Sequence, residues 1–342
     1  MFKKLFYKIL SICLILSALL ICIIQYRSYT YVVKGLNKES FANINKSNLD
    51  NNTVKEVIST SNIIDTTQGN HNLNELNYEK LQSLDLVREN NIKNLTKQQA
   101  ILSLQNKLKK YLGNYINNIG LTYYDINSNT QININEGKTF LAGSTVKVQM
   151  NIILYDEYIN GEVSPSESLK FTNDCYEEGT GVLQGQDLSK PLPIQELSDY
   201  SIIHSDNIAT HMIMDRLDYE KMRTLIDKKL GHATDHSDNY ITPKDEATLL
   251  LTLYNNKDNN PYYSQLINNM KNTDFHDRID RYIPHDITAH KIGDYENYVN
   301  DVGIIYTKAP YILSIYSNEI PNANEVLAHI SKMIYDFQTS QK

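Results

Sequence analysis

Three short stretches of this 342-residue chain hold side chains that suit nucleophilic catalysis by a serine. They are "STVK" at Ser144 to Lys147, "SDN" at Ser205 to Asn207 and "HKIG" at His290 to Gly293. A serine hydroxyl is a weak nucleophile at neutral pH, so its attack on an amide requires a base within hydrogen-bond reach. Residues three apart on a helix lie on nearly the same face, which brings the Lys147 amine toward the Ser144 oxygen.

Each stretch taken alone also has an ordinary structural explanation. The Ser-x-x-Lys pattern arises by chance in many lysine-rich chains, and "SDN" suits a helix N-cap. "HKIG" fits the end of a strand before a turn. Lys147 must be neutral, at least transiently, to accept a proton, and burial or a nearby cation such as Lys291 favours the neutral amine. Lys291 equally suits the binding of a substrate carboxylate.

The elements that must position these residues are indicated by the hydrophobic pattern. "GLTYYDI" and "QININ" alternate as strands do, and "NSNT" between them predicts a hairpin over 120–135. A two-stranded hairpin is barely stable alone. Further strand patterns follow at 286–292, 301–306 and 311–317. We therefore predict an α+β fold with one five-stranded antiparallel sheet, covered on one face by the first and last helices.

Helical spacing occurs at both ends of this domain and between the two groups of strands. "TKQQ", which starts at Thr96, has the form of a capping box, and Gly113 ends the first helix. Its apolar face is predicted to be Ile101, Leu104, Leu108 and Tyr111; that of the last helix is Val326, Leu327, Ile330, Met333, Ile334 and Phe337. Helices over 146–158, 208–217 and 222–230 would form a helical second lobe. Ser144 would then open the helix that enters a cleft between the lobes.

The order of the three stretches resembles that of class A β-lactamases and penicillin-binding proteins, which carry Ser-x-x-Lys, Ser-Asp-Asn and Lys-Thr-Gly. The likeness extends from about Thr96 to the C-terminus and includes "GTGVLQG" at 179–185 and "NDVGII" at 300–305. Each motif is weak, but their order and structural context together identify the family. The resemblance implies a β-lactamase/transpeptidase-like fold.

The resemblance also implies a role for each site residue. Ser144 is the nucleophile, Lys147 its base, Ser205 the relay of a proton to the departing nitrogen, and Asn207 the residue that holds Lys147 and the substrate amide. The implied substrate-binding residues are Lys291, Gly293 and Asp294. The backbone N–H groups of Ser144 and Asp294 would stabilise the oxyanion, and such donors supply about 3 kcal/mol each. The resemblance implies no cofactor and no metal.

Two departures from the family pattern bear on function. Ile292 stands where family members usually have Thr or Ser, so a hydroxyl that would bind the substrate carboxylate is missing. Class A enzymes also have a loop whose glutamate activates the deacylating water, but this chain has no Glu from Gly231 to Tyr240. Loss of such a base removes roughly 100- to 10,000-fold from the water step, so the acyl-enzyme should persist.

The shortened segment contains residues that could replace the missing glutamate or bind a metal. Its Asp235, His236 or Asp238 could replace the missing base. "HATDH" at His232 to His236 imitates an i, i+4 pair of metal ligands, but so short a polar segment favours a turn.

Three functions follow from the resemblance. The chain is a β-lactamase with an unusual water-activating group, a penicillin-binding or peptide-processing enzyme with slow deacylation, or a non-catalytic wall-binding module. The expected partner is a β-lactam or a D-Ala-D-Ala stem peptide of peptidoglycan. Nothing in the sequence indicates an oligomeric state.

The N-terminal part predicts a membrane protein. Residues 9–24 are apolar except for Ser11 and Ser17, and residues 5–26 are about long enough to cross a bilayer as a helix. Lys3, Lys4 and Lys8 place the N-terminus in the cytoplasm. We expect an uncleaved anchor at 1–27, an Asn-rich stalk at 28–95 and an extracytoplasmic hydrolase domain at 96–342. Beyond residue 34 the chain carries 28 Lys and Arg against 40 Asp and Glu, which argues against nucleic acid as a partner. Cys175 is the only cysteine outside the apolar segment, which excludes an internal disulfide there.

Overall fold

The computed structural model describes residues 97–340, which lie within one compact unit, Leu86–Lys342. The predicted anchor, the stalk and the Thr96 cap fall outside the described residues. Within 97–340, none of the helices combines the length and apolar character that a bilayer crossing requires.

A single five-stranded antiparallel sheet forms the centre of the unit, as the sequence predicts. Its strands lie in the order β2-β1-β9-β8-β7. Their bounds are β1 Ile119–Asp125, β2 Thr130–Ile134, β7 Thr288–Tyr295, β8 Tyr298–Ile305 and β9 Tyr311–Ser317. The hairpin therefore pairs with the last strand of the domain across nearly 200 residues of chain, and the edge strand β7 brings "HKIG" to the border of the second lobe.

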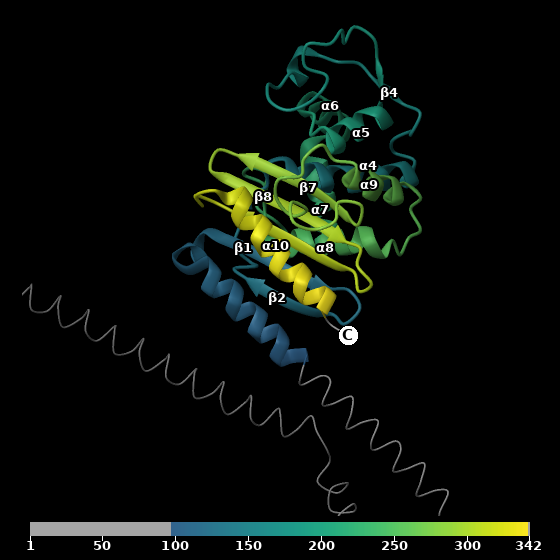
Figure 1. Ribbon diagram of the computed structural model, residues 1–342. Coiled ribbons are helices and arrows are strands. Elements are labelled where there is room, and N and C mark those ends of the chain that lie inside the picture. Colours follow the sequence, from purple (N-terminus) through teal and green to yellow (C-terminus); the bar gives the residue numbers. More distant parts are fainter. Residues whose placement is uncertain (1–96, 341–342) are drawn as a thin grey trace, which may run out of the picture. The chain divides into compact units, whose positions relative to one another are not determined.

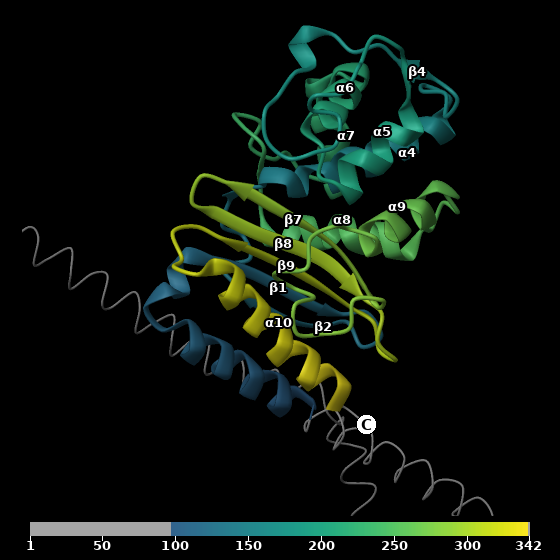
Figure 2. The ribbon, with the colours of Figure 1, turned by 45° about the horizontal axis from the view of Figure 1, so that its top comes forward.

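Two helices cover one face of this sheet (Figures 1 and 2). They are the helix over 97–112 and α10, Ala323–Ser340, which share a core with β1, β2 and β9. The prediction for the first helix is wrong at Tyr111, which is 42% exposed. Leu112 lies in the core in its place, beside Leu104 and Leu108, because the buried face follows the i, i+4, i+8 spacing of 104, 108 and 112. Gly113 has φ of +51° and begins a 3₁₀ turn, η1, Gly113–Asn118.

The second lobe is helical apart from the short pair β4, Ser168–Leu169, and β5, Leu192–Pro193. Its helices are α4 Val146–Asn160, α5 Ile194–Ile203, α6 Asn207–Leu217, α7 Tyr219–Leu230 and α9 Tyr262–Lys271, with a 3₁₀ turn η3 at Asn173–Cys175. The predicted helices at 146–158, 208–217 and 222–230 are confirmed, whereas α5 and α9 had no separate prediction. Helix α4 is apolar on most sides and is buried among α5, α7 and α9.

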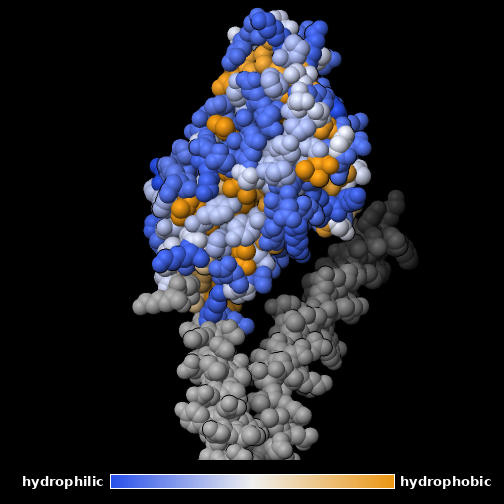
Figure 3. Space-filling model, turned by 90° about the vertical axis from the view of Figure 1, so that its right-hand side faces the viewer, coloured by the Kyte–Doolittle hydropathy of each residue, from blue (hydrophilic) through white to orange (hydrophobic). Residues whose placement is uncertain are grey.

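Two elements join the lobes. Helix α8, Pro243–Asn255, packs against β1 and β9 on the sheet face opposite α10. Strand β3, Phe140–Leu141, pairs with β6, Tyr240–Ile241, directly before the turn that carries Ser144. On the face drawn in Figure 3 the surface is largely hydrophilic, and its apolar residues form small separate patches.

A buried polar network lies beneath this junction. Glu246 on α8 is fully buried and accepts a hydrogen bond from Gln149 Nε2 at 2.9 Å. The Tyr316 hydroxyl, close to Glu246, also hydrogen-bonds to Thr145 Oγ1 at 2.9 Å. Burial raises the pKa of Glu246 to about 8, although the Gln149 hydrogen bond acts in the opposite direction. The carboxyl is therefore mostly protonated at neutral pH.

This pKa predicts a pH-dependent stability. From about pH 4.5 to about pH 8 the folded chain keeps a proton on Glu246 that the unfolded chain releases. The free energy of unfolding should therefore fall as the pH rises, by up to about 1.4 kcal/mol per pH unit from this group. In Glu246→Gln this contribution disappears, so urea unfolding from pH 5 to 8 should show a flatter profile than wild type. The exposed Glu162→Gln serves as control; parallel profiles for all three proteins would contradict the assignment.

Candidate active site

Ser144 lies in a one-turn 3₁₀ helix, η2, Gly143–Thr145, which leads directly into α4. Gly143 has φ of +52°, a conformation that favours glycine. A Cβ at Gly143 would lie 2.9 Å from the backbone N of Asp294, so the two segments touch through their main chains. This contact places the predicted oxyanion donor Asp294 beside the Ser144 turn.

Strands β7 and β8 hold the turn from the other side. A Cβ at Gly293 would lie 2.4 Å from the Ala142 carbonyl oxygen, so only glycine allows this approach. The buried Asn300 donates from Nδ2 to the carbonyls of Leu141, at 2.9 Å, and Ala142, at 3.1 Å. Backbone contact and side-chain hydrogen bonds together fix the position of Ser144 against the sheet.

Lys147 lies in the first turn of α4 and is buried, with 3% of the residue exposed. Its Nζ donates to the Ser205 carbonyl at 2.6 Å, to Ser205 Oγ at 3.2 Å and to Asn207 Oδ1 at 2.8 Å. Burial lowers the pKa of Lys147 to about 7, even though the charges of Glu177 and Asp206 act to raise it. A substantial fraction of this amine is neutral at physiological pH.

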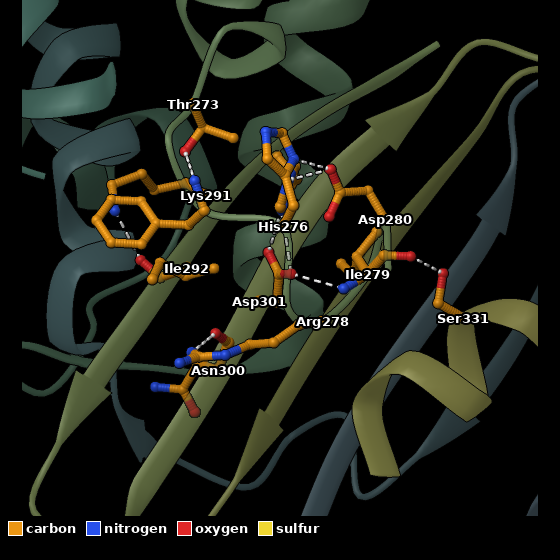
Figure 4. Close-up of polar contacts among 12 residues, drawn as sticks. Thr273, His276, Arg278, Ile279, Asp280, Lys291, Ile292, Asn300, Asp301 and Ser331 are labelled. Atoms are coloured by element: carbon orange, nitrogen blue, oxygen red, sulfur yellow. Dashed lines mark hydrogen bonds and ion pairs between the residues drawn. The ribbon is translucent and has the colours of Figure 1, made fainter. Parts of the chain in front are cut away.

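Lys291 meets the same serine from β7. Its fully buried Nζ donates to Ser205 Oγ at 2.9 Å. It also donates to the Ile292 carbonyl at 2.8 Å (Figure 4). Burial, and then the positive charge of Lys147, lowers the pKa of Lys291 well below its ordinary value. The structure thus brings Lys147, Ser205, Asn207 and Lys291 together, as the sequence predicts.

Within "SDN", Asp206 has a structural role, whereas Ser205 and Asn207 contact Lys147. The Asp206 carboxylate caps α6 by accepting from Ala209 N at 2.8 Å, and it also accepts from Val182 N at 2.6 Å and Leu183 N at 2.7 Å. Gly181 is required here, since a Cβ would lie 2.3 Å from the Asp206 carboxylate. The cap reading of "SDN" is correct for Asp206, while Ser205, at φ of +53°, and Asn207 turn toward Lys147.

Ser144 itself is partly exposed and forms no side-chain hydrogen bond to any residue in 97–340. The direct Ser144–Lys147 hydrogen bond expected from the helical spacing is therefore not formed. Lys147 has three N–H donors when charged, and Ser205 and Asn207 occupy all of them. Catalytic hydrogen bonds often tighten only when substrate is bound, so the arrangement leaves Ser144 available to an incoming carbonyl.

The side chain of Asp294 is occupied by an arginine that sequence reasoning missed. Arg278 Nη2 donates to both carboxylate oxygens of Asp294, at 2.8 and 2.7 Å. Its Nη1 donates to the Asn300 carbonyl at 2.9 Å (Figure 4). Such a bidentate pair is among the stronger charge-assisted contacts. Its signal in the sequence is only one of the two arginines in "DRIDR", and nothing local indicates a partner 16 residues away.

The candidate bases of the shortened loop have partners of their own. His236 Nε2 pairs with Asp227 at 3.0 Å, and Asp235 accepts from the backbone and hydroxyl of Ser237. Asp238 accepts from Asn239 N at 2.7 Å. Within 97–340, no carboxylate or imidazole hydrogen-bonds to Ser144 or Lys147.

The segment "HATDH" lies in the turns expected for it, and its two histidines do not meet. His232 pairs with Asp245 at 2.9 Å, whereas His236 pairs with Asp227. Cys175, the cysteine of the described residues, is buried against Asp215, and burial raises the pKa of its thiol. Neither feature competes with the serine-centred site.

Comparison with known families agrees with this geometry. The beta-lactamase enzyme family matches residues 103–338, which is more than half of the chain. The chain belongs to the beta-lactamase enzyme family. No curated protein sequence matches it.

Solved structures show the same β-lactamase fold. PBP-A is similar with a TM-score of 0.64 and 23% identity, over 69% of this chain and 96% of that one. TLA-1 extended-spectrum β-lactamase gives 0.62 and 24%, over 70% and 99%. The β-lactamase from Sphaerobacter thermophilus gives 0.62 and 20%, over 71% and 99%. The predicted fold class is confirmed.

The close contact at Gly293 generates a prediction. In Gly293→Ala the added methyl group must push the Ala142 carbonyl away from β7, which displaces the Ser144 turn. Overpacking of this kind costs about 1–3 kcal/mol, so the urea midpoint should fall and labelling of Ser144 by penicillin should slow. Gly137→Ala is the control, since nothing lies within 4 Å of its Cβ. Equal behaviour of the two variants would mean that this contact does not position the serine.

Proposed function

We propose that the chain is a serine hydrolase that forms an acyl-enzyme on Ser144 with β-lactams or with D-Ala-D-Ala-type peptides. The observation that carries the proposal is the buried Lys147 amine, three residues from Ser144, with its pKa lowered to about 7 and its contacts to Ser205 and Asn207. Burying a lysine is costly, because burial disfavours its charge, so a buried lysine calls for a functional explanation. Perturbed groups in contact with a candidate nucleophile's neighbours are typical of active sites.

The proposed acylation begins with attack by Ser144 and ends with departure of the substrate nitrogen. Ser144 Oγ attacks the substrate carbonyl while the neutral Lys147 amine takes the hydroxyl proton, and the C–O bond forms. The backbone N–H groups of Ser144 and Asp294 receive the negative charge that develops on the carbonyl oxygen. Ser205, which lies within hydrogen-bond distance of both lysines, passes a proton to the departing nitrogen as the C–N bond breaks.

Slow deacylation is the second part of the proposal. It rests on the absence of Glu from 231–240 and on the partners already held by Asp235, His236 and Asp238. Without a positioned base, water attacks the ester at a rate roughly 100- to 10,000-fold below that of an assisted step. The acyl-enzyme should therefore accumulate.

Carboxylate recognition by this site is proposed to be weak. Ile292 supplies no hydroxyl, and the Arg278 guanidinium already pairs with Asp294. Lys291 remains as the cation that would attract the substrate carboxylate, but burial lowers the pKa of its amine well below the ordinary value. The preceding apolar segment supports an extracytoplasmic, membrane-anchored location, where β-lactams and wall peptides are found.

Titration with labelled substrates tests the acyl-enzyme. The full-length chain is incubated with a fluorescent penicillin and, separately, a chromogenic cephalosporin. We expect one stable adduct per chain on Ser144, found by peptide mass spectrometry, and little cephalosporin turnover. Ser144→Ala should remove the adduct, because it removes the attacking oxygen, and Ser264→Ala, an exposed serine elsewhere, should keep it.

The alternatives give different results. Multiple turnovers that depend on Ser144 would overturn slow deacylation and favour a true β-lactamase with another water-activating group. An adduct that survives in Ser144→Ala would mean that another group is acylated, and would overturn Ser144 as the nucleophile. No adduct and no turnover with any penicillin or D-Ala-D-Ala thioester would favour the non-catalytic wall-binding module.

The lowered pKa of Lys147 predicts the pH dependence of labelling. Acylation requires the neutral amine, so its rate should rise about tenfold per pH unit below pH 7 and level off above it. Stopped-flow measurement of adduct formation from pH 5 to 9 checks this. Lys147→Arg keeps a positive charge but cannot act as a base, so it should label poorly at every pH. A flat wild-type profile would exclude Lys147 as the base.

A further inference from the structure

A second group of titratable side chains lies outside the proposed active site. His276 and Asp280, from the segment between α9 and β7, meet His290 of β7, and their ligand-type atoms all lie within 4.8 Å of one another. Asp280 Oδ2 lies 2.5 Å from His276 Nδ1 and 3.2 Å from His290 Nε2. His285 Nε2 lies 3.9 Å from the same oxygen. Three imidazoles thus converge on one carboxylate.

Two buried atoms of this cluster have no hydrogen-bond partner. They are Asp280 Oδ1 and His290 Nε2, the latter 3.2 Å from Asp280 Oδ2 but without the geometry of a hydrogen bond, in side chains that are each only 1% exposed. Unsatisfied buried polar atoms are costly and few in folded proteins, so each requires an explanation. Both belong to residues that could bind the same ion.

Asp301 fixes the orientation of the central imidazole. Its carboxylate oxygens lie 3.0 and 3.1 Å from His290 Nδ1, and Oδ2 also accepts from Ile279 N at 2.9 Å (Figure 4). A histidine that donates from one ring nitrogen to a carboxylate presents the lone pair of the other, which is the usual second sphere of a metal-bound histidine. Nε2 of His290 is the nitrogen left for an ion.

We propose that His276, Asp280 and His290, joined by His285, form a structural site for a divalent transition metal of the zinc class. Imidazole nitrogen and carboxylate oxygen are zinc ligands, bound at about 2.0–2.2 Å in tetrahedral geometry. His276 and His285 are the two exposed members, with 38% and 52% of their side chains accessible, so their rings can adjust around an ion. At present the two rings stack at 4.2 Å.

The site would fasten a long segment to the edge strand. Successive residues of a strand point to opposite faces, so His290 and its neighbour Lys291 lie on opposite sides of β7. The segment that supplies His276 and Asp280 also carries Arg278, the partner of Asp294. Ser331 of α10 donates to the Ile279 carbonyl at 2.7 Å, which ties the same segment to the far helix (Figure 4). The ion would act on stability and would not touch substrate.

The competing arrangement is a metal-free ionic cluster, in which a protonated His290 lies between Asp280 and Asp301. Both arrangements tolerate the observed contacts. His276 contacts Asp280 at 2.5 Å in either arrangement, so the affinity for zinc, and not the contact itself, separates the two.

Zinc binding by the chelator-stripped full-length chain tests the proposal. Competition with a chromogenic zinc chelator should give one bound Zn²⁺ per chain, and added zinc should raise the melting temperature, because an ion that binds only the folded state stabilises it. Cobalt(II) should give visible absorption of tetrahedral type. In His276→Gln the affinity should fall by more than the ~10- to 100-fold typical of an outer-sphere change, and Asp280→Asn should behave alike.

The controls separate this site from other histidines. His232→Gln, in the "HATDH" segment, should bind zinc as wild type does. The proposal is overturned if the wild-type chain binds no zinc, or if His276→Gln and Asp280→Asn, shown to be folded by circular dichroism, bind it with unchanged affinity. Its failure would leave the labelling of Ser144 by penicillin unaffected, so the two proposals are tested apart.

Discussion

Two buried lysine amines share one serine hydroxyl, and most of the chemistry proposed for this chain depends on that contact. Ser205 Oγ lies 3.2 Å from Lys147 Nζ and 2.9 Å from Lys291 Nζ. Two ammonium charges in a buried site repel each other, and each also loses its hydration, which costs several kcal/mol per ion. The favoured solution is that at least one amine gives up its proton. A base therefore results from packing and charge, without any special reactivity of lysine itself.

The fold makes this contact possible by bringing main chains very close. Gly143 and Gly293 allow the Ser144 turn to touch β7, and Asn300 holds the same turn from β8. On the opposite side, Asp206 binds its own helix and the 182–183 backbone with one carboxylate. Each lobe thus fixes one half of the site.

The sequence predicted the helices and strands better than the long-range side-chain contacts between them. The hairpin, the late strands and helices α4, α6 and α7 follow from local periodicity, and β9 was predicted with its observed bounds, 311–317. The predicted β7 and β8 began or ended a few residues from the observed bounds, because strand ends depend on pairing. Lys147 and Ser205 were brought together only by family resemblance, since no local pattern links residues 58 apart. The pairing of Arg278 with Asp294 and the His290 cluster escaped prediction for the same reason.

The missed arginine changes how the site should recognise a substrate. A guanidinium without a partner would strengthen the binding of a substrate carboxylate. Arg278, however, already binds the Asp294 carboxylate through both of its oxygens. An incoming carboxylate must therefore compete with an internal one, and Ile292 offers no hydroxyl to help it. In the proposed mechanism, acyl transfer and carboxylate recognition use different residues. We therefore expect the acyl donor to be held mainly by its amide and by shape, with little contribution from a terminal carboxylate.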